Sequence, residues 1–111
     1  MKLKNMLAAA FVFYSAQASA DYDNNFRGKV LDVLTYPYSK NILIRVEGQP
    51  NSHPLCTRFD YMVIDGAIDS EARQLVYTRL LLAFARGENV NIGYDSKDEC
   101  VGSRVKVYRV G

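Results

Sequence analysis

The chain has 111 residues, among them 14 Lys and Arg, 12 Asp and Glu, one His and two Cys. Lys2 and Lys4 lie in the first twenty residues, so residues 21–111 carry 12 basic and 12 acidic side chains and are formally neutral. Their charges of both signs are interspersed, whereas phosphate binding needs clustered Lys and Arg, so the composition argues against a nucleic-acid-binding protein. Residues 21–111 are enough for one domain.

Residues 1–20 have the pattern of a cleavable signal peptide. A basic start is followed by an uncharged run over residues 6–16 and by Ala18-Ser19-Ala20, an Ala-x-Ala cleavage site. The apolar run is shorter than the roughly 20 residues that a membrane span needs, so a membrane-anchored or buried helix is the weaker alternative. We therefore expect an exported, periplasmic or secreted protein that begins at Asp21 and has no membrane span.

Both cysteines, Cys56 and Cys100, lie in the predicted mature chain. A disulfide is the simplest role for two cysteines in a small exported domain. The alternative of a reactive or metal-bound thiol lacks neighbours, because there is no Cys-x-x-Cys motif and His53 is the only histidine. We expect no metal and no cofactor.

Three strands are predicted before a single helix. Residues 29–36 are rich in β-branched and aromatic side chains and end at Pro37, residues 42–47 alternate between apolar and polar, and residues 56–64 form the third strand. Residues 48–54 form a loop with two prolines. Residues 21–25 are polar and are predicted to be loose.

The helix begins at a cap provided by Asp69 or Ser70 and ends at Gly87. Its predicted core stripe is made of Ala72, Val76, Leu80, Ala83 and Phe84. Beyond the helix, Val90, Ile92 and Tyr94 alternate, residues 95–99 make a charged turn, and residues 104–110 form the last strand.

This order, three strands, one helix and two strands, predicts a mainly β protein built as an OB-fold-like five-stranded barrel over residues 21–111. An α+β sandwich with an open sheet is the alternative. In either fold a bridge between Cys56 and Cys100 would join the start of the third strand to the hairpin between the last two strands.

The sequence contains no arrangement typical of catalysis. His53 is predicted to be a solvated turn residue, and no glycine-rich phosphate loop is present. Asp95, Asp98 and Glu99 lack the EF-hand spacing, so a solvated turn is favoured over a calcium site. We expect a protein that is not an enzyme.

Two features of the sequence suggest a function in binding. Leu75 and Leu82, with Arg79 and Arg86 beside them, lie off the core stripe of the helix and are candidates for a subunit interface, although scattered surface leucines are common. The segment that follows the first strand combines aromatic rings with hydroxyl and amine groups. That mixture suits a sugar, although an ordinary Tyr-Pro turn looks similar. The ligand-binding candidates there are Tyr36, Tyr38, Ser39 and Lys40.

At the level of pattern, the chain resembles the B subunits of subtilase cytotoxin and typhoid toxin. The resemblance includes Pro37-Tyr38 before the second strand, Cys56 near the third, the helix over residues 72–87, and Gly-x-x-Val-x-Ile-x-Tyr-Asp over residues 87–95 with a cysteine soon after. It implies an OB-fold, a ring of five subunits whose helices line the centre, binding of host glycans, and an A-type subunit as cargo.

The chain departs from that family in two places. Residues 21–27 contain no Tyr-Ser-Asp-type element, and the family's carboxy-terminal extension is missing, so no family sugar-binding residue is transferred. The leading hypothesis is an exported, toxin-B-like binding protein, with a glycan and a homo-oligomer (pentamer) as its expected partners. The alternative is a periplasmic structural or inhibitory protein that binds another protein.

Overall fold

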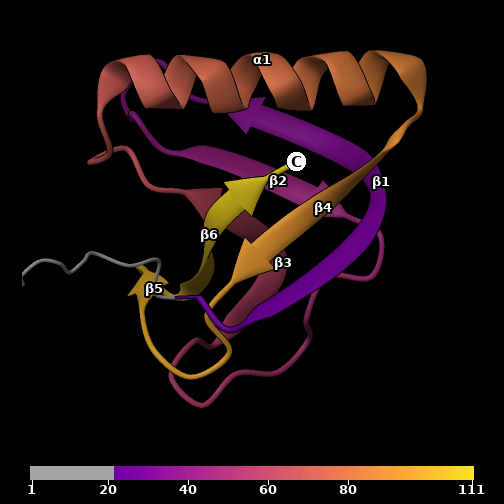
Figure 1. Ribbon diagram of the computed structural model, residues 1–111. Coiled ribbons are helices and arrows are strands. Elements are labelled where there is room, and N and C mark those ends of the chain that lie inside the picture. The colour runs from indigo at the N-terminus through magenta and orange to yellow at the C-terminus, as the bar shows by residue number, and fades with distance from the viewer. Residues whose placement is uncertain (1–21) are drawn as a thin grey trace, which may run out of the picture.

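The computed structural model describes residues 22–111, and the predicted signal peptide lies outside the described residues. Figure 1 shows a small, strongly curved sheet with one helix across its end. In chain order the elements are β1 (Asn24–Thr35), β2 (Ile42–Val46), β3 (Arg58–Ile64), α1 (Ser70–Arg86), β4 (Asn89–Tyr94), β5 (Cys100–Val101) and β6 (Arg104–Val110).

The strands close into a barrel because β1 is long enough to pair with two neighbours. Its first half, from Asn24 to Lys29, pairs with β4, and its second half, from Val30 to Thr35, pairs with β2 across a bulge near Val30. A parallel pairing of β3 with β6 closes the ring. The predicted OB-fold-like five-stranded barrel is therefore confirmed, and the open-sheet sandwich is wrong. The two-residue β5, which was not predicted, extends the sheet at β6.

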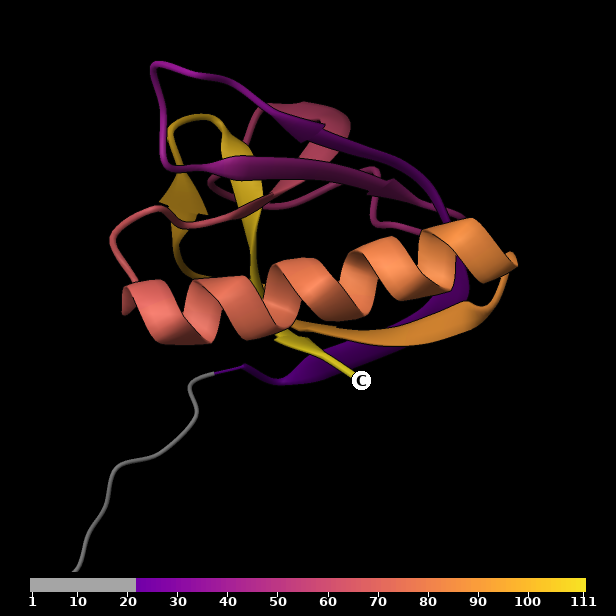
Figure 2. The same ribbon diagram turned by 90° about the horizontal axis from the view of Figure 1, so that it is seen from above.

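The barrel interior is filled by apolar side chains from every long strand and from the helix. Figures 1 and 2 show α1 lying across one end of the barrel, alongside β1 and β4. Leu80 and Ala83 of α1 are fully buried against the barrel. The largest fully buried side chains are Ile44, Met62, Leu80, Ile92, Val46, Val63, Val90 and Val105.

The ends of α1 follow the predicted signals. The Asp69 side chain accepts hydrogen bonds from the backbone N–H groups of Glu71 and Ala72, so Asp69 and not Ser70 is the cap. At the other end Gly87 adopts a left-handed conformation with φ of 67°, which glycine reaches without steric cost.

The predicted core stripe of α1 is only partly correct. Val76, Leu80 and Ala83 pack inward, whereas Ala72 and Phe84 are exposed. Ala72 and Phe84 lie in the first and last turns, so the ends of the helix leave them open to solvent.

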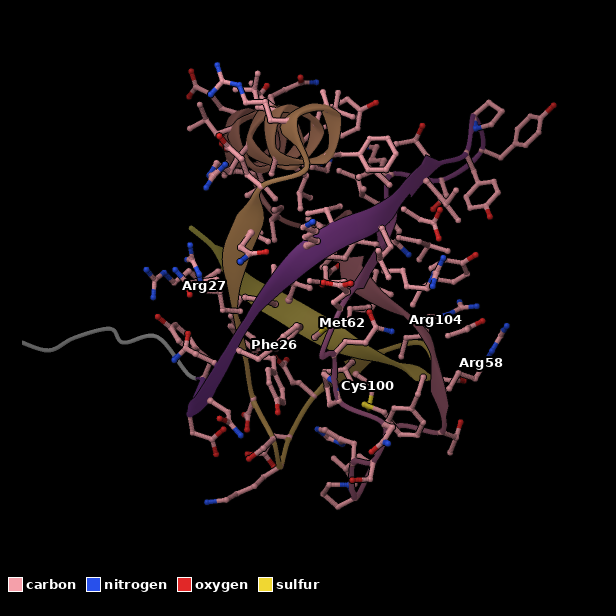
Figure 3. The ribbon with its side chains drawn as sticks, turned by 90° about the vertical axis from the view of Figure 1, so that its right-hand side faces the viewer. Phe26, Arg27, Arg58, Met62, Cys100 and Arg104 are labelled. Atoms are coloured by element: carbon pink, nitrogen blue, oxygen red, sulfur yellow. A yellow bond between two sulfur atoms is a disulfide. The ribbon has the colours of Figure 1, made fainter. Side chains whose placement is uncertain are left out.

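The Cys56–Cys100 disulfide is formed and joins the residues just before β3 to β5. In Figure 3 the Cys100 sulfur lies at the end of the barrel that is remote from the helix. The same two segments are also joined without covalent bonds, because the N–H groups of Thr57 and Arg58 both donate to the Ser103 carbonyl at 2.9 Å.

Two strands begin at other residues than predicted. β1 begins at Asn24, inside the segment predicted to be loose, because its polar residues pair with β4 from Asn24 to Lys29. β3 begins at Arg58 rather than at Cys56.

Candidate functional site

A concavity of about 550 Å³ opens where the start of β1, the loop 47–57 and the end of β4 meet. We call it the polar hollow, and it is lined by Asn24, Pro50, Asn51, Ser52, His53, Pro54, Tyr94 and Ser96. This site was not predicted from the sequence, because its residues come from three segments that only the closed barrel brings together.

His53 fixes the loop that forms one wall of the polar hollow. Its Nε2–H donates to the Asp95 carbonyl oxygen at 3.0 Å, and its Nδ1 accepts from the N–H groups of Leu55 (3.0 Å) and Cys56 (3.2 Å). The ring is partly buried. The prediction of a merely solvated turn residue is therefore wrong: His53 is a structural link between the loop and the turn after β4.

The opposite wall is held by side chains at the start of β1 and the end of β4. Asp23 accepts hydrogen bonds from the Ser96 N–H at 2.9 Å and from the Ser96 hydroxyl at 3.0 Å, and the Ser96 N–H bond holds the pKa of Asp23 below its usual range. The Tyr94 ring packs edge-on against Phe26 with ring centroids 6.0 Å apart. Burial of Tyr94, reinforced by the nearby Asp23, raises the pKa of its hydroxyl.

The free polar groups of the hollow are uncharged. Within residues 22–111 the side chains of Asn51 and Ser52 and the hydroxyl of Tyr94 form no hydrogen bond with protein. They therefore present an amide and two hydroxyls beside an aromatic ring. The lining contains no Asp, Glu, Lys or Arg, and both ring nitrogens of His53 are already engaged.

The sequence-predicted ligand residues fall in a different place. Ser39 and Lys40 line a second concavity of about 280 Å³ between the loop 36–41 and α1. We call it the loop–helix pocket, and it is lined by Thr35, Ser39, Lys40, Asn41, Ile42, Arg73, Gln74 and Tyr77. Tyr36 and Tyr38 do not line it. They are 50% and 97% exposed, so the structure separates the four predicted residues into two pairs.

A charged cluster occupies the outer surface of the barrel between β3 and β6, where Figure 3 shows Arg58 and Arg104 on the same side. Arg104 binds Asp60 through two parallel hydrogen bonds of 2.9 and 3.0 Å, and Arg58 adds a contact of 3.0 Å. These bonds hold the pKa of Asp60 well below its usual range, and the hydrogen bond from Arg104 has the largest effect. The cluster of two arginines and one aspartate keeps a net charge of +1, and its Asp60–Arg104 pair joins β3 to β6.

Asp95, Asp98 and Glu99 of the acidic turn line one concavity, but among the described residues their carboxylate oxygens do not form a group of three within 4.8 Å of one another. Asp95 is buried and its side chain accepts from the Lys97 N–H, while Glu99 accepts from the Tyr108 hydroxyl and from Lys106. Across the described residues, the group that unites three potential metal ligands is His53, Cys56 and Cys100, whose two sulfurs are bonded to each other.

The predicted interface residues on α1 differ in exposure. Leu75 is 71% and Leu82 49% exposed, whereas Arg79 is partly buried. The arginines beside them have partners within the chain, since Arg79 donates to the Gly111 carbonyl at 3.4 Å and Arg86 lies 3.6 Å from Glu88.

Along residues 22–111, no helix is both long and apolar enough to cross a membrane. Comparison of the chain with protein-family models, with curated proteins and with solved structures gives no match.

Proposed function

We propose that this chain is an exported, non-enzymatic carbohydrate-binding protein that holds a sugar in the polar hollow. The observation that carries the proposal is the lining of the hollow, where the Tyr94 ring lies among uncharged amide and hydroxyl groups without protein partners. A sugar offers apolar ring faces for an aromatic side chain and hydroxyls for these groups. Export is supported by the signal-peptide pattern and by the disulfide.

The hollow is held in one shape before any ligand arrives. His53 joins the loop to Asp95, the bridge at Cys56 fixes the loop's end, and Asp23 holds Ser96. Binding to such a preorganised site loses less conformational entropy than binding to a mobile loop.

The same contacts argue against catalysis in the hollow. Ser52 is adjacent to His53 in sequence, the pair that a nucleophilic mechanism would use. However, both ring nitrogens of His53 are committed to backbone groups, so the imidazole has no free nitrogen with which to accept a proton from Ser52.

The test is a titration of the isotope-labelled mature protein with a panel of neutral and acidic oligosaccharides, followed by amide chemical shifts. We expect shifts centred on residues 50–54 and 94–96. Asn51→Ala and Tyr94→Phe should each weaken binding about fivefold to tenfold, the loss of one hydrogen bond to a ligand. Thr78→Ala, on the exposed side of α1, is the matched control. A panel without any shift in the hollow would refute the proposal.

A second function, assembly into a ring of five, is favoured by the exposed leucines of α1. We propose that the side of α1 bearing Leu75 and Leu82 packs against a second copy of this chain, as the resemblance to toxin B subunits implies, with an A-type subunit as a further partner. Light scattering on a sizing column should give a pentamer, and Leu75→Lys or Leu82→Lys should dissociate it. Leu55→Lys is the control, because Leu55 is also exposed (60%) but lies in the loop before β3 and not in α1.

A monomer in that experiment would refute the ring. It would favour the alternative, a protein that uses the same leucines to bind a different protein partner in the periplasm.

A further inference from the structure

The loop–helix pocket differs from the polar hollow in charge. Two of its lining residues, Lys40 and Arg73, are cationic, and no carboxylate is among the eight. The acidic side chains nearest in sequence are outside the lining: Asp69 caps α1, Asp65 accepts from the Ala67 N–H and lies 3.9 Å from Lys106, and Glu71 is in the first turn of α1. The lining itself therefore carries two positive charges and no negative charge.

Two hydrogen-bond acceptors of the pocket are already used within the protein. The Ser39 hydroxyl oxygen accepts from the Asn41 N–H at 3.1 Å, and the Asn41 side-chain oxygen accepts from the Gly66 N–H at 2.7 Å. The Ser39 O–H and the Asn41 NH₂ group remain available as donors.

Among the other lining residues, Lys40 and Arg73 can only donate, whereas the Gln74 amide and the hydroxyls of Thr35 and Tyr77 can donate or accept. Arg73 uses one terminal nitrogen, Nη1, on the carbonyls of Gly66 (3.2 Å) and Ile68 (3.4 Å), which leaves its Nε–H and its other terminal nitrogen. Within residues 22–111 the Lys40 ammonium and the Gln74 side-chain amide form no bond with protein. The pocket thus offers several N–H and O–H donors together with the positive charges of Lys40 and Arg73.

A close approach of two loops fixes these donors in position. A methyl group built on Gly66 would lie 2.6 Å from the Lys40 Cβ and 2.7 Å from the Lys40 carbonyl carbon. Only glycine allows the turn before α1 to pack this closely against the loop 36–41. The donors of Ser39 and Asn41 are consequently held beside Arg73 and Gln74 of the helix.

From this arrangement we infer that the loop–helix pocket binds the oxyanion group of a small ligand: a carboxylate, sulfate or phosphate. Such groups carry only acceptors and a negative charge, which complements a pocket that has donors, positive charge and no free carboxylate. The inference does not depend on sugar binding in the polar hollow, since the two sites share no residue.

The test uses the mature, oxidised protein, titrated separately with sodium sulfate, inorganic phosphate, glucuronate and neutral glucose at constant ionic strength. Amide shifts should centre on residues 39–41, 66 and 73–74 for the three anions and be absent for glucose. Lys40→Met should weaken anion binding about tenfold, whereas Lys40→Arg should retain most of it. The matched control is Lys97→Met, which removes an exposed lysine of the turn after β4.

The outcomes separate the possible sources of the anion. Equal affinity for sulfate and glucuronate indicates a site that recognises the free oxyanion, and tighter binding of glucuronate indicates a sugar acid. The inference is overturned if glucose shifts the same amides equally, if Lys40→Met binds like the wild type, or if Lys97→Met loses as much affinity as Lys40→Met. Asn51→Ala should leave anion binding unchanged whatever its effect in the polar hollow.

Discussion

Replacing Cys56 and Cys100 together by alanine removes the covalent link between the entrance to β3 and β5. The bridge spans 44 residues, and the chain-entropy relation for a loop of that length gives about 4 kcal/mol at 25 °C. A domain of this size is stable by only about 5–15 kcal/mol, so the loss should be a large share of the total. Cys56 is also buried, so the smaller side chain adds a cavity cost that the single Cys56→Ala variant, compared with reduced wild type, measures separately.

The native contacts indicate whether the disulfide acts mainly on the folded state or on the unfolded state. The segments that it joins stay together through the bonds of Thr57 and Arg58 to Ser103 and through the Asp60–Arg104 pair. The folded barrel should therefore survive without the bridge, and the main effect should be a more expanded unfolded chain.

Urea denaturation followed by far-ultraviolet circular dichroism tests this reasoning. Compared with oxidised wild type, the double variant should show a lower free energy of unfolding and also a larger dependence of that free energy on urea, because its unfolded state exposes more surface. Wild type reduced with dithiothreitol should behave in the same way. A loss below about 1 kcal/mol with an unchanged urea dependence would refute the argument from chain entropy.

Further variants test the core, the charged cluster and the loop link. Leu80→Ala should cost about 3 kcal/mol in urea denaturation, since the side chain is fully buried, with exposed Leu81→Ala as its control. The pKa of Asp60 is lower in the folded state, so its stabilisation is present above the unfolded pKa and is lost as pH falls through the folded one. Asp60→Asn should therefore lose about 1 kcal/mol at neutral pH and progressively less towards pH 2, and an equal loss at both pH values would contradict this. His53→Ala should increase amide exchange at Leu55 and Cys56, whose N–H groups lose their acceptor, and unchanged exchange would show that the link is not needed.

The elements of this fold could be predicted because their signals are local. Asp69 and Gly87 mark the helix ends, and the alternation of Val90 and Ile92 marks a strand, through interactions within a few residues. The start of β1 was missed for the opposite reason. Asn24 and Asn25 have low strand propensity, and they are extended only because β4, far along the chain, pairs with them.

The candidate sites could be predicted only in part, for a related reason. Ser39 and Lys40 are neighbours in sequence, so they could be predicted together as ligand-binding candidates. Arg73 is distant in sequence and lies beside them because the turn at Gly66, whose carbonyl it binds, packs against their loop. The polar hollow unites Asn51 with Tyr94 across the barrel, and no sequence spacing encodes that contact.

The path of β1 also has a mechanical consequence. β1 and β6 both run antiparallel to β4, so they point in the same direction with β4 between them. A force that pulls Asn24 and Val110 apart along the strands would load the rungs of β1–β4 and β4–β6 in shear, many at once, instead of opening them one after another. Rupture of this geometry is governed by the unfolding barrier rather than by equilibrium stability. The barrel should therefore resist stretching from its two ends far better than its small core suggests.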